Sequence, residues 1–222
     1  MPRALPDGRV TGVSGGKLVI LDVGTRAEAV LGEGEGVRQV AVDGTGRVFV
    51  LRNATVTRFS AEGEPLDIAV AASASRLAVA ASGDRIGVLD LAENRVSILD
   101  ANSGETLAST EGPDSTHRAH AFAFVRERVF WAGRRSLDWL GANGRTGEWP
   151  VGRPLVCCGL VPDGDGLIVG DFDAARVVRL VAEERPALLL EAPTGRLFAF
   201  ATCGEDIVQV ISSSGTTGRP VY

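Results

Sequence analysis

Short apolar runs alternate with clusters of turn residues along the whole chain. The pattern is clearest over residues 79–107, where β-type runs ending at Ser82, Leu91 and Asp100 are separated by Ser-Gly-Asp, Ala-Glu-Asn and Asn-Ser-Gly. Runs of Val, Ile and Leu interrupted in this way predict strands joined by tight turns. Because no segment keeps a helical period, we expect less than ~10% helix.

The strand-turn pattern repeats at a nearly constant interval. One strand of each repeat begins at an equivalent position, and successive starts lie 38, 38, 43, 38 and 40 residues apart. These starts are Arg9, Arg47, Arg85, Arg128, Gly166 and Asp206. About 40 residues is the length of one four-stranded propeller blade. The sequence therefore predicts an all-β fold, a β-propeller of four-stranded antiparallel blades that forms a single domain over residues 1–222.

The number of blades depends on how the two ends of the chain are assigned. Residues 1–8 contain two prolines and are not expected to supply an inner strand for the blade that begins at Arg9. Residues 196–202 are apolar and are spaced like the other inner strands, so we expect them to pair with the N-terminal strands and close the ring. This assignment gives five blades, the favoured count. Six blades with an incomplete last blade is the alternative.

The fourth strand of each repeat has the weakest pattern. These strands are expected near residues 27–31, 64–69, 105–109, 146–151 and 186–191. Outer edge strands are often short, charged or interrupted by proline, and Pro65 and Pro186 fit that description. We therefore place these segments at the outer edge of each blade.

The repeats resemble the propeller superfamily of YVTN, NHL and quinoprotein-like repeat proteins. Segments 76–84, 96–110 and 140–149 carry this resemblance. The last is similar to the tryptophan-docking repeat of pyrroloquinoline quinone enzymes, with Thr146, Gly147, Glu148 and a Trp149 that stands one position early. The resemblance implies that Trp149 docks on a neighbouring blade. It implies no particular cofactor, and we expect none.

Composition narrows the possible partners and compartments. The net charge is −5 and no arginine-rich run occurs, which argues against nucleic acid as a partner. No apolar run approaches the ~18 residues of a membrane span, and the first residues lack a secretory signal. Three cysteines, with Cys157 and Cys158 adjacent, make no disulfide framework, so we expect buried reduced thiols. These features predict a cytoplasmic protein that does not contact membranes.

The segment 109–120 holds the extra residues of the one 43-residue interval and both histidines of the chain. By position it connects a fourth strand to the next first strand, on the face of a propeller that usually carries ligands. Asp114, Arg118, His117 and His120 are therefore candidate binding residues. The histidines and Asp114 have side chains suited to metal ligation or acid–base work. A polar surface loop without such a role is the alternative, and we predict no metal site.

Tryptophans and aspartates supply two further candidates. Trp131, Trp139 and Trp149 all fall in one repeat, and Trp139, next to Asp138, is the one expected to be exposed and to bind. The run 162–173 contains four aspartates but lacks the closing Glu of an EF-hand loop. It is interpreted as a hairpin turn.

The sequence places no catalytic set across the repeats, and no catalytic residue is assigned. We therefore expect a non-catalytic protein-interaction or scaffold propeller whose partner is another protein. The first alternative is a small-ligand-binding propeller, or a hydrolase or lyase, that uses the central channel. The second is a partial propeller completed by oligomerisation or by a partner chain.

Overall fold

The computed structural model describes residues 3–5, 8–22, 24–59, 65–70, 73–113, 121–132, 136–150, 157–171, 176–181, 187–191, 196–203 and 206–212. These residues form 22 strands and no helix, in agreement with the predicted all-β fold. It follows that no helix in this part of the chain is long and apolar enough to cross a membrane.

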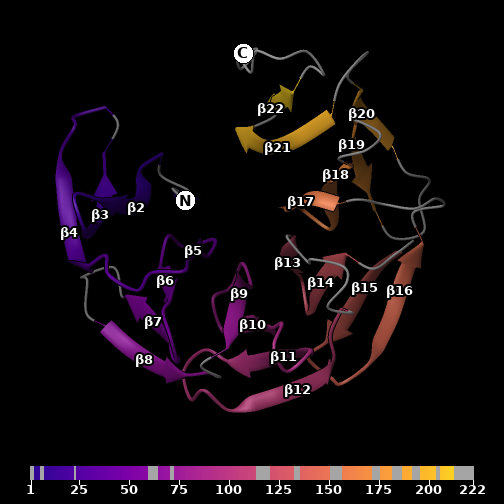
Figure 1. The fold of residues 1–222 in the computed structure, drawn as a ribbon, viewed down its shortest axis with the longest axis horizontal. Coiled ribbons are helices and arrows are strands. Elements are labelled where there is room, and N and C mark those ends of the chain that lie inside the picture. The colour runs from indigo at the N-terminus through magenta and orange to yellow at the C-terminus, as the bar shows by residue number, and fades with distance from the viewer. Residues whose placement is uncertain are drawn as a thin grey trace. The chain divides into compact units, whose positions relative to one another are not determined.

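Twenty of the strands form five four-stranded sheets in chain order (Figure 1). The first sheet contains β1 (Arg3–Ala4), β2 (Val10–Ser14), β3 (Lys17–Leu21) and β4 (Glu28–Glu33). The second contains β5 (Gln39–Val42), β6 (Val48–Leu51), β7 (Thr55–Phe59) and β8 (Pro65–Ala69). The third contains β9 (Ala74–Val79), β10 (Arg85–Asp90), β11 (Arg95–Asp100) and β12 (Thr106–Glu111). The fourth contains β13 (Phe122–Val125), β14 (Arg128–Ala132), β15 (Ser136–Gly141) and β16 (Thr146–Pro150). The fifth contains β17 (Cys157–Asp163), β18 (Gly166–Asp171), β19 (Arg176–Leu180) and β20 (Ala187–Glu191).

The last two strands, β21 (Arg196–Cys203) and β22 (Asp206–Ser212), form a separate two-stranded sheet. It corresponds to the incomplete last blade of the alternative count. The strands of the sheets run antiparallel to their neighbours, as the predicted tight turns require. The predicted architecture of four-stranded antiparallel sheets is confirmed.

The N-terminal segment differs from the expectation. Arg3 and Ala4 form β1 and pair with Thr11 and Val10 of β2. Residues 1–8 therefore do supply the inner strand of the first sheet, and the expectation that they would not is wrong. The two prolines do not prevent it because they flank β1 rather than lie within it. Pairing of residues 196–202 with the N-terminal strands stays a prediction.

The chain divides into two compact units, each described by itself. Unit 1 comprises residues 1–112 and 140–145, and unit 2 comprises residues 113–139 and 146–222. Each unit packs its sheets face to face around apolar side chains. One cluster in unit 1 joins the second and third sheets through residues that include Phe49, Leu77 and Ile86. A cluster in unit 2 joins the fourth and fifth sheets through residues that include Phe130 and Leu167.

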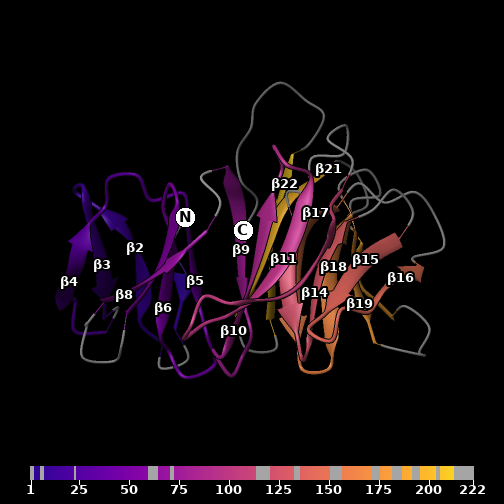
Figure 2. The same cartoon turned by 90° about the horizontal axis from the view of Figure 1, so that it is seen from below.

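In the second, third and fifth sheets the second strand is the most buried element. Every residue of β6 and of β18 is buried, as are five of the six residues of β10. A strand covered on both faces is apolar throughout instead of alternating, which explains why these runs gave the clearest repeat in the sequence. Figure 2 shows these strands from the side, with turns at their ends.

The outer strands have a regular feature that the sequence pattern did not reveal. In three sheets the pairing of the third with the fourth strand shifts by one residue, so that one residue of the outer strand is extra. The extra residues are Leu31 in β4, Leu107 in β12 and Leu189 in β20. A β-bulge of this kind twists an exposed edge and makes it a poor template for another strand.

Candidate functional site

Four of the five predicted binding residues, Asp114, His117, Arg118 and His120, lie outside the described residues. The fifth, Trp139, lies in β15 and is half-buried. The guanidinium carbon of Arg128 is 4.2 Å from the centroid of the Trp139 ring, a cation–π geometry. Gly147 of β16 packs against the Nε1–Cζ2 side of the ring, where an added Cβ would come within 2.6 Å of Cζ2. Trp139 therefore already has an arginine and a glycine backbone as neighbours.

The other two tryptophans pack inside unit 2. Trp131 is buried, and Trp149 is half-buried with its ring centroid 5.5 Å from that of Phe130. Phe130 belongs to β14 of the same sheet, whereas the resemblance implied docking on a neighbouring blade. Trp149 also borders the apolar cluster shared by the fourth and fifth sheets. It therefore contributes to the core of unit 2.

Buried carboxylates mark the ends of several strands, and Asp90 at the end of β10 shows what they do. Its Oδ1 accepts hydrogen bonds from the backbone N–H groups of Ala92 and Glu93, at 2.9 and 3.0 Å, and its Oδ2 accepts one from the Ser73 hydroxyl at 2.5 Å. Burial by itself raises the pKa of Asp90, but these hydrogen bonds and the charge of Arg95 together lower it below its ordinary value. Asp90 is thus a fixed anion that orders the turn after β10.

Asp43 orders the turn after β5 by accepting hydrogen bonds in a similar way. Its Oδ1 accepts from the backbone N–H groups of Thr45 and Arg47, and its Oδ2 accepts from Arg47 Nε at 2.6 Å. The same guanidinium group donates from Nη2 to the carbonyl oxygen of Ser82 in the next sheet, at 2.6 Å. Gly83 has a φ of +67°, and a Cβ there would lie 2.0 Å from Asp43 Oδ2, so the turn after β9 requires glycine.

Backbone hydrogen bonds extend this arrangement across three turns of unit 1. The Gly44 N–H donates to the Ala81 carbonyl and the Ala101 N–H donates to the Asp84 carbonyl, both at 2.8 Å. Arg58 donates from Nη1 to the Ala101 carbonyl at 3.2 Å and to Asn102 Oδ1 at 2.5 Å. We call the turns 43–47, 80–85 and 100–105 together the turn network. It joins the second and third sheets through main-chain as well as side-chain bonds.

Most side chains of the turn network reach solvent. Thr45, Ala81, Ser82, Asn102 and Ser103 are all exposed. Beneath them, Asp100 accepts hydrogen bonds from the backbone N–H groups of Ser103 and Asn102, at 2.8 Å each, and these bonds lower its pKa. The network therefore presents polar side chains on a backbone that is held in place by hydrogen bonds to the carboxylates of Asp43 and Asp100.

A second link joins the same two sheets at their inner strands. The Gln39 side chain in β5 donates from Nε2 to the Leu77 carbonyl at 2.7 Å and accepts from the Leu77 N–H at 3.0 Å. An inner strand at the edge of a sheet leaves backbone groups without a strand partner. The Gln39 amide supplies both the donor and the acceptor that one residue of β9 requires.

The inner strands also share a β-bulge, which sequence reasoning missed. Pairing of the first with the second strand shifts by one residue in the third, fifth and last sheets, and the extra residues are Ser75, Cys158 and Phe198. In the first two cases the residue of the second strand at the shift is an aspartate, Asp90 or Asp171, and both are buried. An insertion of one residue leaves the composition of a short strand almost unchanged, so the pairing of the strands is what reveals it.

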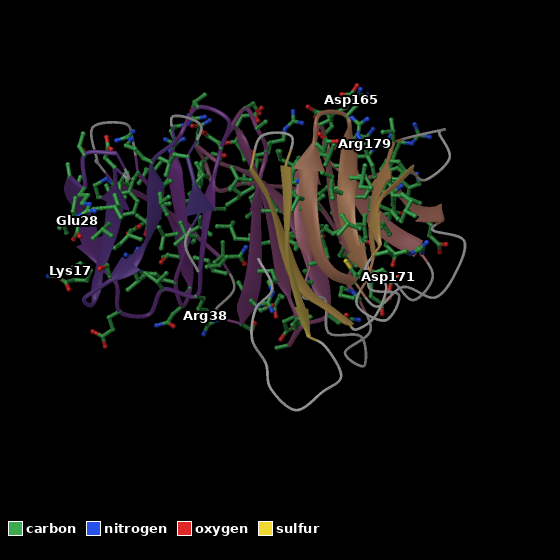
Figure 3. All side chains as sticks on the ribbon, turned by 90° about the horizontal axis from the view of Figure 1, so that it is seen from above. Lys17, Glu28, Arg38, Asp165, Asp171 and Arg179 are labelled. Atoms are coloured by element: carbon green, nitrogen blue, oxygen red, sulfur yellow. The ribbon has the colours of Figure 1, made fainter. Side chains whose placement is uncertain are left out.

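In unit 2, ion pairs gather at the turn between β17 and β18. Asp163 pairs with Arg179 Nε at 2.5 Å, and Asp165 pairs with Arg126 of the neighbouring sheet. Figure 3 shows Asp165 and Arg179 at one end of the β17–β20 sheet and Asp171 towards the other end. Within the run 162–173, the segment from Asp163 to Gly166 thus forms the predicted hairpin turn, and residues 172–173 lie outside the described residues. These exposed pairs are individually weak.

Asp138 of β15 differs from the carboxylates above. Burial raises its pKa, the nearby charge of Glu148 raises it further, and the 2.8 Å hydrogen bond from the Ser136 hydroxyl opposes these effects. A half-buried carboxyl with a raised pKa is a feature of acid catalysts as well as of sheet interiors. Cys157 is a buried free thiol that donates to the Gly159 carbonyl, consistent with the expected reduced state. Among the described residues no three His, Cys, Asp or Glu side chains gather to hold a metal ion.

Comparison with known proteins gives the fold but no family. No family model matches the chain, and no curated protein matches it by sequence. The structure is similar to virginiamycin B lyase from Staphylococcus aureus, with a TM-score of 0.71 and 13% identity over 94% of this chain and 75% of the lyase. It is similar to a chain of a nidogen/laminin complex, with a TM-score of 0.59 and 15% identity over 91% of this chain and 85% of that one. It is also similar to the dihydro-haem d1 dehydrogenase NirN, with a TM-score of 0.62 and 16% identity over 95% of this chain and 50% of NirN.

These similar structures are β-propellers, and they include enzymes as well as a protein found in a complex with another protein. Structural similarity at such low sequence identity shows the fold alone, because proteins with one fold can have many functions. The repeat in the sequence, the four-stranded antiparallel sheets and these neighbours together assign the chain to the β-propeller fold.

Proposed function

We propose that this chain is a non-catalytic protein-interaction module whose partner contacts the turn network of unit 1. The observation that carries the proposal is the direct hydrogen bonding of three turns that are separate in the sequence, through Gly44 to Ala81 and through Ala101 to Asp84. A surface that is already ordered loses little conformational entropy on binding, so more of the contact energy appears as affinity.

The buried carboxylates support the same conclusion. Asp43 and Asp90 each accept three or more hydrogen bonds from their own turn or a neighbouring segment, which occupies the oxygens that acid–base work would need. Their role is to fix backbone positions. The exposed turn residues, in contrast, offer hydroxyl and amide groups of the kind that protein partners recognise.

One observation favours the enzymatic alternative. Asp138 has a raised pKa and a neighbouring carboxylate, Glu148, in the adjacent strand. In the proposed function Asp138 has no role in binding, because it belongs to unit 2 and not to the turn network. The two functions therefore respond to different substitutions.

The experiment places a photo-crosslinking amino acid at Ala81, whose side chain is exposed and whose backbone carbonyl keeps its bond to Gly44. The chain is then irradiated in cells that encode it, and crosslinked species are identified by mass spectrometry. We expect one partner protein from position 81 and none from the matched variant at Leu107, an exposed residue of an outer strand.

Two further variants separate the alternatives. Glu105→Arg should abolish the crosslink from position 81 while leaving the thermal unfolding of the chain unchanged, because the Glu105 side chain is exposed and its backbone carbonyl keeps the bond from the Asp100 N–H. Asp138→Asn should leave the crosslink intact. Equal crosslinking from positions 81 and 107, or loss of the crosslink in Asp138→Asn alone, would contradict the proposal.

A further inference from the structure

The two-stranded sheet has an edge that differs from every other outer edge in the described part of the chain. Among the described residues β22 has β21 as its one partner strand, whereas the second strand of every other sheet has a strand on both sides. In an antiparallel pair alternate residues turn their N–H and C=O groups away from the partner, so β22 offers such groups along its free edge. An edge of this kind is a template for a further strand.

The free edge of β22 lacks the features that protect the other edges. A bulge interrupts β4, β12 and β20, β8 begins with a proline and β16 ends with one. Residues 207–211 contain no proline, glycine or charged residue, and the bulge in the last sheet lies in β21 instead. A short, uncharged segment rich in Val and Ile pairs readily with another strand when its edge is open.

The sequence of β22 points to a specific occupant of that edge. Residues 207–211 read Ile-Val-Gln-Val-Ile, the same in both directions. If two such strands run antiparallel about a two-fold axis at Gln209, Ile207 lies opposite Ile211, Val208 lies opposite Val210, and Gln209 lies opposite its own copy. Every position then meets a residue of identical type and size, as a self-complementary two-fold interface requires.

The number of strands agrees with this pairing. Two copies of the β21–β22 hairpin placed edge to edge give the order β21, β22, β22 and β21. The result is a sheet of four antiparallel strands, the number found in each of the other five sheets. We propose that two copies of this chain associate through β22, with the two-fold axis at Gln209, and so complete the two-stranded sheet. This inference is independent of the turn network.

The first experiment measures the mass of the full-length chain by sedimentation equilibrium over a wide range of concentrations. We expect a reversible dimer of two 23.2 kDa chains. Gln209→Lys places two ammonium groups opposite each other at the axis and should give a monomer, because like charges directly across a strand pair are destabilising. The matched control is Ser109→Lys on the exposed outer strand β12, which should remain a dimer.

A second variant covers the case in which Gln209→Lys does not fold. Residues paired across two antiparallel strands have Cα atoms about 4.5 to 5.5 Å apart, within the range of a disulfide. Gln209→Cys should therefore form a covalent dimer under mild oxidation, while Ser109→Cys and the unchanged chain should not. A monomer at every concentration, a dimer that survives Gln209→Lys, or no crosslink through position 209 would each overturn the proposal.

Discussion

At the scale of single residues, glycines and aspartates determine how closely the turns and strands approach one another. Gly147 is the clearest case, because its missing side chain makes room for the Trp139 ring. Asp90 is a second, since one carboxylate holds both the turn after β10 and the hydroxyl of Ser73. Each residue supports a prediction about stability.

Gly147→Ala should destabilise unit 2 by about 1–3 kcal/mol, the usual penalty for overpacking. The added Cβ would stand 2.6 Å from Trp139 Cζ2 and would displace the ring from under Arg128. Denaturant unfolding measures the loss. In a Trp139→Leu background the same substitution should have almost no effect, and an undiminished effect there would show that Trp139 is not the obstacle.

Asp90 should make the stability of the chain depend on pH. Because its pKa is lowered in the folded state, its contribution is present above the unfolded-state pKa of about 3.9 and is lost as the pH falls through the folded-state value. The free energy of unfolding should therefore decline in acid, and Asp90→Asn should reduce that decline. Glu93→Gln removes an exposed charge from the same turn and serves as the control. An acid profile that is the same for Asp90→Asn and the unchanged chain would contradict this role.

At the scale of elements, sequence periodicity was enough to place most strands, while pairing details were not predictable. The position of strand β10 could be predicted because a strand covered on both faces is continuously apolar in its middle. That of strand β1 could not, since two residues between prolines carry no period. The bulges at Leu107 and Ser75 could not be predicted either. One extra residue changes the pairing register of a strand but hardly changes its composition.

The candidate site shows the same division between local and long-range information. Turn residues such as Asp43 and Gly83 were recognisable as turn residues, but their contact joins two sheets and depends on pairing that the sequence does not show. Gln39 is a similar case, because its partner Leu77 lies 38 residues away. The turn network could therefore not be predicted from spacing.

Gln39 also allows a test of how the second and third sheets are held together. Gln39→Leu removes both hydrogen bonds to Leu77 and should cost about 1–3 kcal/mol of unfolding free energy. Gln39→Glu keeps an acceptor for the Leu77 N–H but loses the donor to its carbonyl when ionised. The stability of Gln39→Glu should therefore approach that of the unchanged chain as the pH falls and the carboxyl gains a proton. No recovery in acid would mean that the bond from Nε2 is unimportant.

At the scale of the whole molecule, the repeat predicts that the two ends of the chain depend on each other. Residues 196–202 are expected to support the N-terminal sheet, although β1 already lies beside β2. Deletion of residues 196–222 should then abolish cooperative unfolding of the entire chain instead of removing one sheet. Calorimetry of the truncated chain measures this. A truncated chain that stays soluble and unfolds in a single sharp transition would contradict the dependence.

The central claim is that the turn network is a rigid, preformed surface, and amide hydrogen exchange tests it most directly. The Gly44 and Ala101 amides donate to carbonyls of another turn, although the turns themselves are exposed. Exchange should therefore be as slow at these two amides as in the middle of β10, because both must wait for the sheets to open. Exchange at the rate of an unstructured chain at Gly44 and Ala101, with β10 protected, would show that the turns are not held together.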